Sequence, residues 1–203
     1  MYAINLELRG RKAVVIGGGK VAERKAAGLL EEGADVTVIS PMLTDGLMKL
    51  AEDGSLSWLK KTFSPEDLKE AFLIFAATDS REVNLAVKDK AAPGQLVNIA
   101  DDPALSDFQV PSLLKRGKLS IAVSTSGASP ILAKKIRSQL EETFDERYEA
   151  YMEFLFFCRK AILAEVNDET KKKQLLAAIT EGSFLNDKER KEKFAKMLKE
   201  ASK

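Results

Sequence analysis

The residues best suited to chemistry fall in three short segments of this 203-residue chain. They are a glycine-rich segment that starts at Gly17, a pair of aspartates, Asp101 and Asp102, and a run of hydroxyl side chains that starts at Ser124. The chain has no histidine, which excludes Ser-His nucleophiles and histidine bases and removes a principal zinc ligand. Its one cysteine, Cys158, cannot form an internal disulfide framework or, alone, a thiolate metal site. We therefore predict no resident metal and expect any catalysis to use carboxylates, hydroxyls, backbone amides or a bound cofactor.

The glycine-rich segment has the order G-x-G-x-x-A. An apolar run ending at Ile16 leads into Gly17, Gly19 and Ala22. Gly17 allows a tight bend, Gly19 lets the backbone approach a pyrophosphate, and the small Ala22 lets helix and strand pack closely. The helix that follows offers unpaired amides and a partial positive charge to phosphates. A plain strand-to-helix turn has the same local pattern, but the flanking strands and helix favour dinucleotide binding.

The end of the second expected strand does not specify which dinucleotide binds. Dinucleotide-binding proteins commonly place an acid there, about twenty residues after the glycines. This chain instead runs into Ser40, Pro41 and Met42, so charge does not distinguish NAD from NADP. Ser40 could serve either cofactor through its hydroxyl or its backbone. Thr78 and Asp79 follow a later strand and are candidates for the same cleft, or for a turn.

Asp101 and Asp102 also close an expected strand. Asp102 precedes Pro103, and Asp-Pro commonly opens a turn, so the pair fits a purely structural turn. Because no histidine is available, these two carboxylates are also the leading candidates for proton transfer or for holding a cationic ring nitrogen.

Ser124, Thr125, Ser126 and Gly127 follow a strand and open a helix. Hydroxyls and backbone amides at a helix N-terminus form a receptor suited to a carboxylate or a phosphate. An ordinary capping loop would require only Ser129. Both interpretations stay open from the residues alone.

The distribution of turn residues divides the chain near residue 130. All six prolines and eleven of the twelve glycines lie before residue 131. In that first part, apolar runs predict strands and alternate with helical patterns; the strands are expected at 13–16, 36–39, 56–59, 72–77, 96–100 and 119–123, and the helices at 21–32, 43–53 and 82–91. Beyond it, helices are expected at 131–142, 146–165, 168–181 and 187–201. This order predicts an α/β fold with a doubly wound parallel sheet, followed by a helical region.

Charge and hydropathy limit the partners. The chain carries 32 Lys and Arg against 31 Asp and Glu, a net charge of +1, so no global field attracts nucleic acid or anionic lipid. No apolar run approaches the roughly 20 residues that cross a bilayer, and residues 1–7 lack the pattern of a signal peptide. We expect a soluble cytoplasmic protein without nucleic-acid or membrane partners.

Taken together, these segments resemble the precorrin-2 dehydrogenase module of siroheme synthesis, which occurs alone or at the N-terminus of multifunctional siroheme synthases. The matching stretches cover nearly all of residues 1–137 in order: INLELRGR, VVIGGGKVAERKAAGLLEEGADVTVISP, FAATDSREVN, VNIADDPALSDFQVPSLLKRG and LSIAVSTSGASPILAKKIR. The resemblance implies a Rossmann-like NAD-binding domain at 1–111, a dimerisation region at 112–143 and a small helical domain at 144–203. It also implies a homodimer that oxidises precorrin-2 to sirohydrochlorin with NAD.

The resemblance further implies roles for particular residues. The NAD contacts of the family fall on Lys20, Val21, Pro41 and Met42, with Thr78 near the cofactor. The functionally important aspartate of the family falls on Asp101. Its hydroxyl loop falls on Ser124, Thr125 and Ser126, where other members often have Ser-Ser-Gly or Ser-Thr-Gly. Our hypothesis is that Asp101 accepts a proton or orients a pyrrole nitrogen of the tetrapyrrole.

Two alternatives stay open at this point. Some family members also insert ferrous iron, and Asp101 could accept the pyrrole protons that this reaction releases, although the sequence has no cluster of His or Cys to hold incoming iron. From a different class, the chain could be a regulatory module that senses NAD and does no chemistry.

Overall fold

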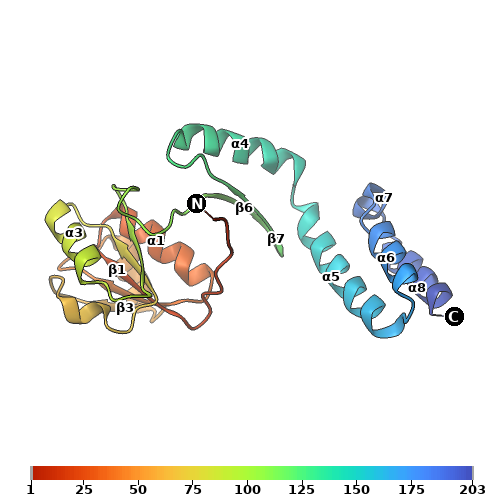
Figure 1. Cartoon of the computed structure of the whole chain (residues 1–203), viewed down its shortest axis with the longest axis horizontal. Helices are drawn as coiled ribbons and strands as arrows, with labels where there is room; N and C mark the ends of the chain where they lie inside the picture. The colour runs from red at the N-terminus through yellow and green to blue at the C-terminus, as the bar shows by residue number, and fades with distance from the viewer. Residues whose placement is uncertain (1, 203) are drawn as a thin grey trace. The chain divides into compact units, whose positions relative to one another are not determined.

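The computed structural model describes residues 2–202 and divides the chain into two compact units. The first unit extends to Val110 and the second begins at Pro111. Figure 1 traces both units in chain order. The expected division of the second part into a dimerisation region ending at residue 143 and a helical domain beginning at residue 144 stays a prediction.

A five-stranded parallel sheet forms the centre of the first unit. Its strands are β1 (Lys12–Ile16), β2 (Asp35–Ile39), β3 (Ser57–Leu59), β4 (Leu73–Ala76) and β5 (Leu96–Ile99), in the spatial order β3-β2-β1-β4-β5. Strand β1 lies in the middle, so that Ala13 pairs with Val36 of β2 on one side and Leu73 of β4 on the other. Because β1 and β4 are buried on both faces, their sequences are continuous apolar runs rather than alternating ones.

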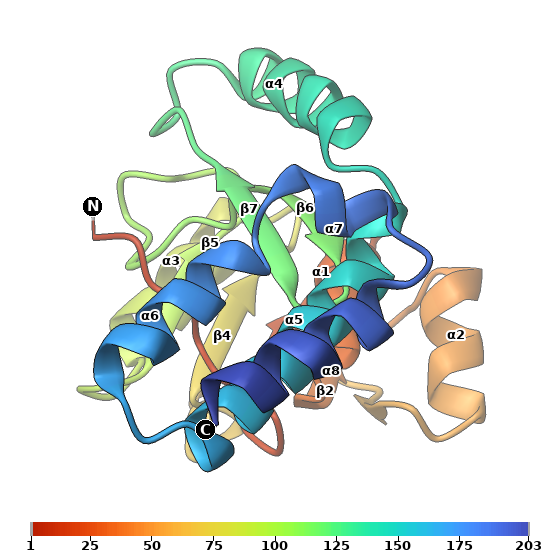
Figure 2. The same ribbon diagram turned by 90° about the vertical axis from the view of Figure 1, so that its right-hand side faces the viewer.

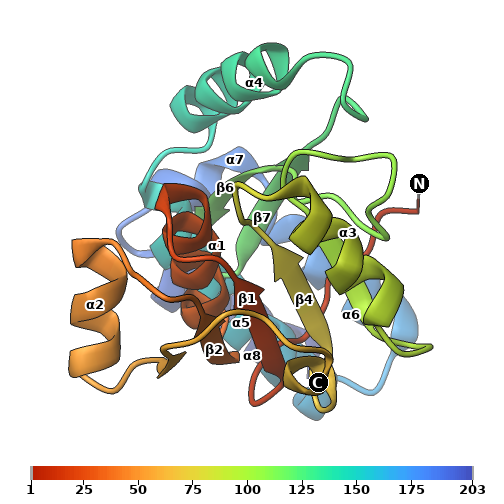
Figure 3. The same cartoon turned by 90° about the vertical axis from the view of Figure 1, so that its left-hand side faces the viewer.

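Helices cover both faces of this sheet. Two of them, α1 (Lys20–Glu31) and α2 (Asp45–Glu52), pack through Ala22, Leu29 and Leu47 into one apolar cluster. On the other face lie α3 (Arg81–Lys90), which contributes Val87, and the short 3-10 helix η1 (Pro65–Leu68), which contributes Leu68. Figure 3 shows α1 and α3 on opposite sides of the sheet. The predicted doubly wound α/β fold is confirmed.

The second unit begins with a hairpin that the sequence patterns only half predicted. Strand β6 (Ser112–Arg116) pairs antiparallel with β7 (Leu119–Val123), and Gly117, with a φ of +55°, lies in the turn between them. The expected strand 119–123 is therefore present, but it belongs to a separate two-stranded sheet. Strand β6 was missed because Lys115 and Arg116 leave it without an apolar run.

Within residues 111–202, five helices complete the second unit. They are α4 (Pro130–Thr143), α5 (Arg147–Glu165), α6 (Glu169–Ala178), α7 (Gly182–Asn186) and α8 (Arg190–Ala201). Helices α5, α6 and α8 lie side by side around a core that includes Phe154, Cys158 and Phe194 (Figure 2). The sequence pattern did not predict α7, and the helix expected to start at residue 187 starts at Arg190. Within residues 2–202, no helix is both long enough and apolar enough to cross a membrane.

Candidate active site

The glycine turn after β1 packs closely against the backbone at the ends of β2 and β4. Gly17 has a φ of +123°, and a Cβ atom built on it would lie 2.3 Å from the carbonyl oxygen of Ala77. A Cβ atom on Gly18 would lie 1.9 Å from the carbonyl oxygen of Met42. The Gly17 amide donates to the Ile39 carbonyl over 2.9 Å, which ties the turn to the end of β2. Both positions therefore exclude a side chain for reasons internal to the fold.

Gly19 differs from its two neighbours, because a Cβ atom built on it would meet nothing within 4 Å. It is the N-cap of α1, with a φ of −86° and a ψ of −173°, and as glycine it has no side chain to accept from the first helical amides. The next residues, Lys20 and Val21, are exposed. An open, uncapped helix N-terminus is the surface that a dinucleotide pyrophosphate requires. The residues of this turn thus fit an NAD-type cofactor.

The segment after β2 lies beside the glycine turn. Ser40 is 8% exposed, and its carbonyl accepts from the Trp58 indole N–H over 2.9 Å. Pro41 and Met42 are exposed, Met42 by 79%. The Thr44 amide donates to the Gly18 carbonyl over 2.9 Å, so this segment is joined to the glycine turn. Accessible apolar surface at Pro41 and Met42 suits contact with an adenosine group.

A carboxylate lies beside the glycine turn, on the first turn of α1. Glu23 pairs with Lys20 over 3.1 Å and accepts a hydrogen bond from the Thr44 hydroxyl. These contacts, with the Thr44 hydrogen bond the stronger influence, lower the pKa of Glu23. Lys20 therefore faces a carboxylate in this structure, although its own side chain is largely exposed.

Asn84, a residue that the sequence analysis did not single out, joins the ends of β4 and β5. Its side chain is buried on α3 and contacts Thr78 on one side and Asp101 on the other. A signal was present in the sequence, because Asn84 lies three residues before the buried Val87 and so occupies the apolar face of the expected helix. A polar residue at such a position requires hydrogen-bond partners.

The two aspartates after β5 border a small hollow but have different partners. The hollow has a volume of about 90 Å³, and its lining consists of Arg81, Asn84, Leu85, Ile99, Asp101 and Asp102. The Asp102 carboxylate lies 3.7 Å from the guanidinium of Arg81. Asp101 is the more exposed of the two, and its carboxylate is reached by the Asn84 amide. Asp101 is therefore the carboxylate better placed to meet a ligand.

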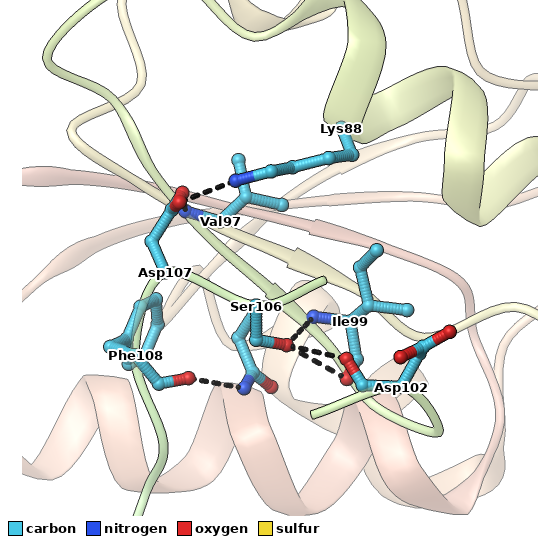
Figure 4. Close-up of polar contacts among 8 residues, drawn as sticks. Lys88, Val97, Ile99, Asp102, Ser106, Asp107 and Phe108 are labelled. Atoms are coloured by element: carbon cyan, nitrogen blue, oxygen red, sulfur yellow. Dashed lines mark hydrogen bonds and ion pairs between the residues drawn. The ribbon is translucent and has the colours of Figure 1, made fainter. Parts of the chain in front are cut away.

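The chain after these aspartates is held firmly along the edge of β5 (Figure 4). The Ser106 hydroxyl accepts from the Ile99 amide over 2.9 Å, and the Asp107 carboxylate accepts from the Val97 amide over 2.9 Å. The Asn98 side-chain amide donates to the Phe108 carbonyl over 3.0 Å. Side chains thus satisfy amides of an edge strand that a sixth strand would otherwise pair.

Lys88 on α3 forms an ion pair with Asp107 at the same edge of the sheet. Burial by itself would raise the pKa of Asp107, but hydrogen bonds from Lys88 and from the Val97 amide outweigh it and lower the pKa. The charged form of this carboxylate is therefore part of the folded structure. It fixes the segment that begins at Asp101 and leads to the second unit.

The hydroxyl loop lies in the second unit, between β7 and α4. The Ser124 hydroxyl accepts from the Ser126 amide over 3.2 Å, and the Thr125 hydroxyl accepts from the Ser129 amide over 3.1 Å. Ser129 caps α4 by accepting from the Leu132 amide, as the capping interpretation requires. Each hydroxyl still has its own proton to donate to a ligand.

Two consecutive residues of this loop adopt left-handed backbone conformations. Ser126 has a φ of +51° and Gly127 a φ of +86°. Both residues are exposed. A serine in this conformation is uncommon, since its Cβ atom crowds the backbone there.

The predicted site residues are thus divided between the two units. The glycine turn, Ser40 to Met42, Thr78 and Asp101 share one edge of the sheet in the first unit, and Ser124 to Gly127 lie in the second. Over residues 2–202, no group of three or more Cys, Asp or Glu side chains is arranged to hold a metal ion.

Three family models together match most of the chain. Residues 4–112 match a model described as NAD(P)-binding, residues 116–143 match the central region of a sirohaem biosynthesis protein, and residues 148–194 match the SirC C-terminal domain. The precorrin-2 dehydrogenase of Priestia megaterium is 38% identical over 184 residues, which span 91% of each chain. The chain belongs to the precorrin-2 dehydrogenase family.

Other members of this family support the same assignment. The precorrin-2 dehydrogenase of Bacillus subtilis strain 168 is 36% identical over 79% of this chain and 99% of its own. Siroheme synthase 3 of Aeromonas hydrophila is 39% identical over 77% of this chain but only 34% of its own. The solved structure of SirC, a precorrin-2 dehydrogenase, aligns with a TM-score of 0.84 and 35% identity over 98% of this chain and all of that one. The family resemblance and the NAD(P)-binding fold predicted from the sequence are confirmed.

Proposed function

We propose that this protein catalyses the oxidation of precorrin-2 to sirohydrochlorin, with NAD as the electron acceptor. The observation that carries this proposal is the position of Asp101. Its exposed carboxylate follows β5, and the open N-terminus of α1 follows β1, so both lie at the same carboxyl edge of one parallel sheet. Ligands of doubly wound sheets bind at this edge.

The cofactor is proposed to occupy the glycine turn and the segment after β2. Backbone amides at Gly19 to Val21 would hold its pyrophosphate, and Pro41 and Met42 would contact its adenosine. We propose NAD because the family resemblance implies it; the SPMLT segment that follows β2 contains neither an acid for a ribose hydroxyl nor an arginine for a 2′-phosphate. Bound NAD supplies the hydride acceptor for the oxidation. Thr78, at the end of β4, lies between this turn and Asp101 in the strand order and is proposed to line the cofactor site.

The substrate must lose a proton as well as a hydride to reach sirohydrochlorin. Asp101 is proposed to accept this proton, or to hold a pyrrole N–H of the macrocycle by a hydrogen bond. Precorrin-2 carries several carboxylates, and the hydroxyl donors of Ser124, Thr125 and Ser126, with the amide of Gly127, are proposed to bind them.

We also propose that the protein acts as a homodimer. In support, Ile131 and Leu132 on α4 are 81% and 48% exposed, so the helix presents apolar side chains to solvent in the single chain. Molar mass from light scattering at micromolar concentration tests this. A cytoplasmic location remains a prediction from the sequence.

The test is an anaerobic assay with precorrin-2 and NAD, in which NADH and sirohydrochlorin absorbance are followed together. The parent protein is expected to form both products. Asp101→Ala is expected to lower kcat by about 100-fold, the scale of a lost general base, with the Kd for NAD unchanged. Asp89→Ala is the matched control, because Asp89 is an exposed carboxylate of α3 that pairs with its neighbour Lys90 and does not line the hollow at Asp101.

Three other results would each point elsewhere. Full turnover by Asp101→Ala would remove that residue from the mechanism. NAD binding by the parent protein without tetrapyrrole turnover would favour the sensing module. Siroheme formation after ferrous iron is added would show that the protein is also a ferrochelatase, with iron as a second substrate.

A further inference from the structure

Asn84 is the most completely buried polar side chain of the first unit. It is 1% exposed on α3, in a core otherwise formed by Val87, Ile99 and other apolar residues. Its amide oxygen accepts from the Thr78 amide over 3.2 Å and from the Thr78 hydroxyl over 2.8 Å. Its amide nitrogen donates to the Thr78 carbonyl over 3.0 Å and reaches Oδ1 of Asp101 at 3.5 Å.

The backbone partners determine which way the Asn84 amide faces. The Thr78 N–H can only donate, so the oxygen of Asn84 must face it. The Thr78 carbonyl can only accept, so the nitrogen of Asn84 must face that group. The nitrogen has two protons, and the second is the one directed at Asp101. An exchange of the oxygen and nitrogen would place two donors together at the Thr78 amide, and two acceptors together at the Thr78 carbonyl and at Asp101.

The surroundings of Asn84 make it a rigid support. Ser80 caps α3 by accepting from the Val83 amide over 3.3 Å, and the Ser80 amide donates to the Thr78 hydroxyl over 3.2 Å. The turn between β4 and α3 is thus closed by several short-range bonds, and Asn84 is anchored to it through Thr78. Asp101, by contrast, is exposed beside the hollow, where its carboxylate has room to rotate.

We propose that Asn84 is a positioning residue, which holds the Asp101 carboxylate in one orientation relative to Thr78 and the cofactor site. This inference rests on the proposed role of Asp101 in the oxidation. A side chain that donates from a fixed support lowers the number of orientations that the carboxylate samples, and correct orientation is a large part of catalysis. The alternative is that Asn84 only closes the turn at Thr78.

The experiment compares Asn84→Ser in two backgrounds, the parent protein and Asp101→Asn. Serine is too short to reach Asp101, so we expect kcat to fall about tenfold or more in the parent background. In the Asp101→Asn background we expect a further fall of less than about twofold, because Asn84 acts through the carboxylate that is already absent. Single-turnover rates make the low activities measurable. A structural role at Thr78 alone predicts the same fall in both backgrounds and would overturn the proposal.

Asn98→Ser is the matched control for the loss of a buried asparagine. Asn98 is 8% exposed, and its side-chain amide bonds to Phe108 instead of Asp101. We expect it to lower the urea midpoint while its effect on kcat is the same in the parent background as in the Asp101→Asn background. If its effect on kcat also vanished with the Asp101 carboxylate, general destabilisation would explain both results and the proposal would fail.

A double-mutant cycle on stability tests the contact between Asn84 and Asp101 without any turnover. Asn84→Asp places two carboxylates together and is expected to lower the urea midpoint. Combining it with Asp101→Asn restores one donor and one acceptor, and the double variant is expected to be more stable than the two single shifts predict. If the changes in urea midpoint of the two single variants simply added in the double variant, Asn84 and Asp101 would not be in contact. If the parent protein did not oxidise precorrin-2, the proposed function would fail, and this stability cycle would still decide whether Asn84 and Asp101 are coupled.

Discussion

Substituting Gly19 by alanine separates cofactor binding from folding. Among residues 2–202, apart from Gly19 itself and its two chain neighbours, no residue has an atom within 4 Å of the added methyl group. The backbone conformation at Gly19, φ −86° and ψ −173°, is open to alanine. Alanine is a poorer N-cap than glycine, which costs roughly 0.5–1 kcal/mol. Alanine also lowers the conformational entropy of the unfolded chain, which stabilises the folded protein by about 0.4–1 kcal/mol. We therefore expect the free energy of unfolding to change by less than about 1 kcal/mol.

The effect on the cofactor is expected to be much larger. The methyl group would occupy the space through which the pyrophosphate approaches the amides of α1. Displacing the phosphate by enough to lose one charge-assisted hydrogen bond costs about 1.5–3 kcal/mol, which corresponds to a Kd for NAD weaker by roughly 10- to 150-fold. Isothermal titration calorimetry with NAD and urea unfolding of the same preparation measure the two quantities.

Two other glycines provide controls for this experiment. Gly28 lies within α1, and among residues 2–202 no atom outside its two chain neighbours and the adjacent helix backbone lies within 4 Å of a Cβ atom built on it. Gly28→Ala is therefore expected to stabilise the helix by about 0.5–1 kcal/mol and leave NAD affinity unchanged. Gly17→Ala is expected to destabilise the unit by about 1–3 kcal/mol, because of its φ of +123° and its clash with Ala77. NAD binding by Gly19→Ala at the parental affinity would refute the placement of the pyrophosphate.

Three further substitutions test a strained backbone conformation, a hydrogen bond at the edge of β5 and the burial of a thiol. Ser126→Gly is expected to raise the free energy of unfolding by about 0.5–1 kcal/mol, since it relieves a left-handed serine at φ +51°; an unchanged urea midpoint would contradict this strain. Ser106→Ala leaves the Ile99 amide without its acceptor and is expected to cost about 1–3 kcal/mol in the same measurement, whereas a neutral result would mean that the edge of β5 is satisfied in another way. Burial raises the pKa of the Cys158 thiol from 9.0 to about 11, so the unfolded chain loses this proton first as the pH rises. Between about pH 9 and 11 the parent protein should therefore lose up to about 3 kcal/mol of stability relative to its value at pH 8, and Cys158→Ala should lack this part of the loss; parallel pH curves for the two proteins would argue against it.

Much of the fold follows from local sequence patterns. The apolar runs of β1, β2 and β4 are flanked by turn residues, and the order of glycines after β1 permits only a tight turn into a helix. Ser129 and Pro130 define the start of α4 in the same way, since a capping hydroxyl and a fixed φ act within one helical turn. These features are short-range, so the sequence was sufficient to predict them.

The remaining features depend on contacts between distant segments. Strand β6 has one buried residue, Leu114, and becomes a strand only because β7 supplies its hydrogen bonds. Asn84 was not singled out because its partner Asp101 lies 17 residues further along the chain. Whether an asparagine amide on one helix meets a carboxylate after another strand depends on how α3 packs against the sheet, and that packing is a property of the whole tertiary structure.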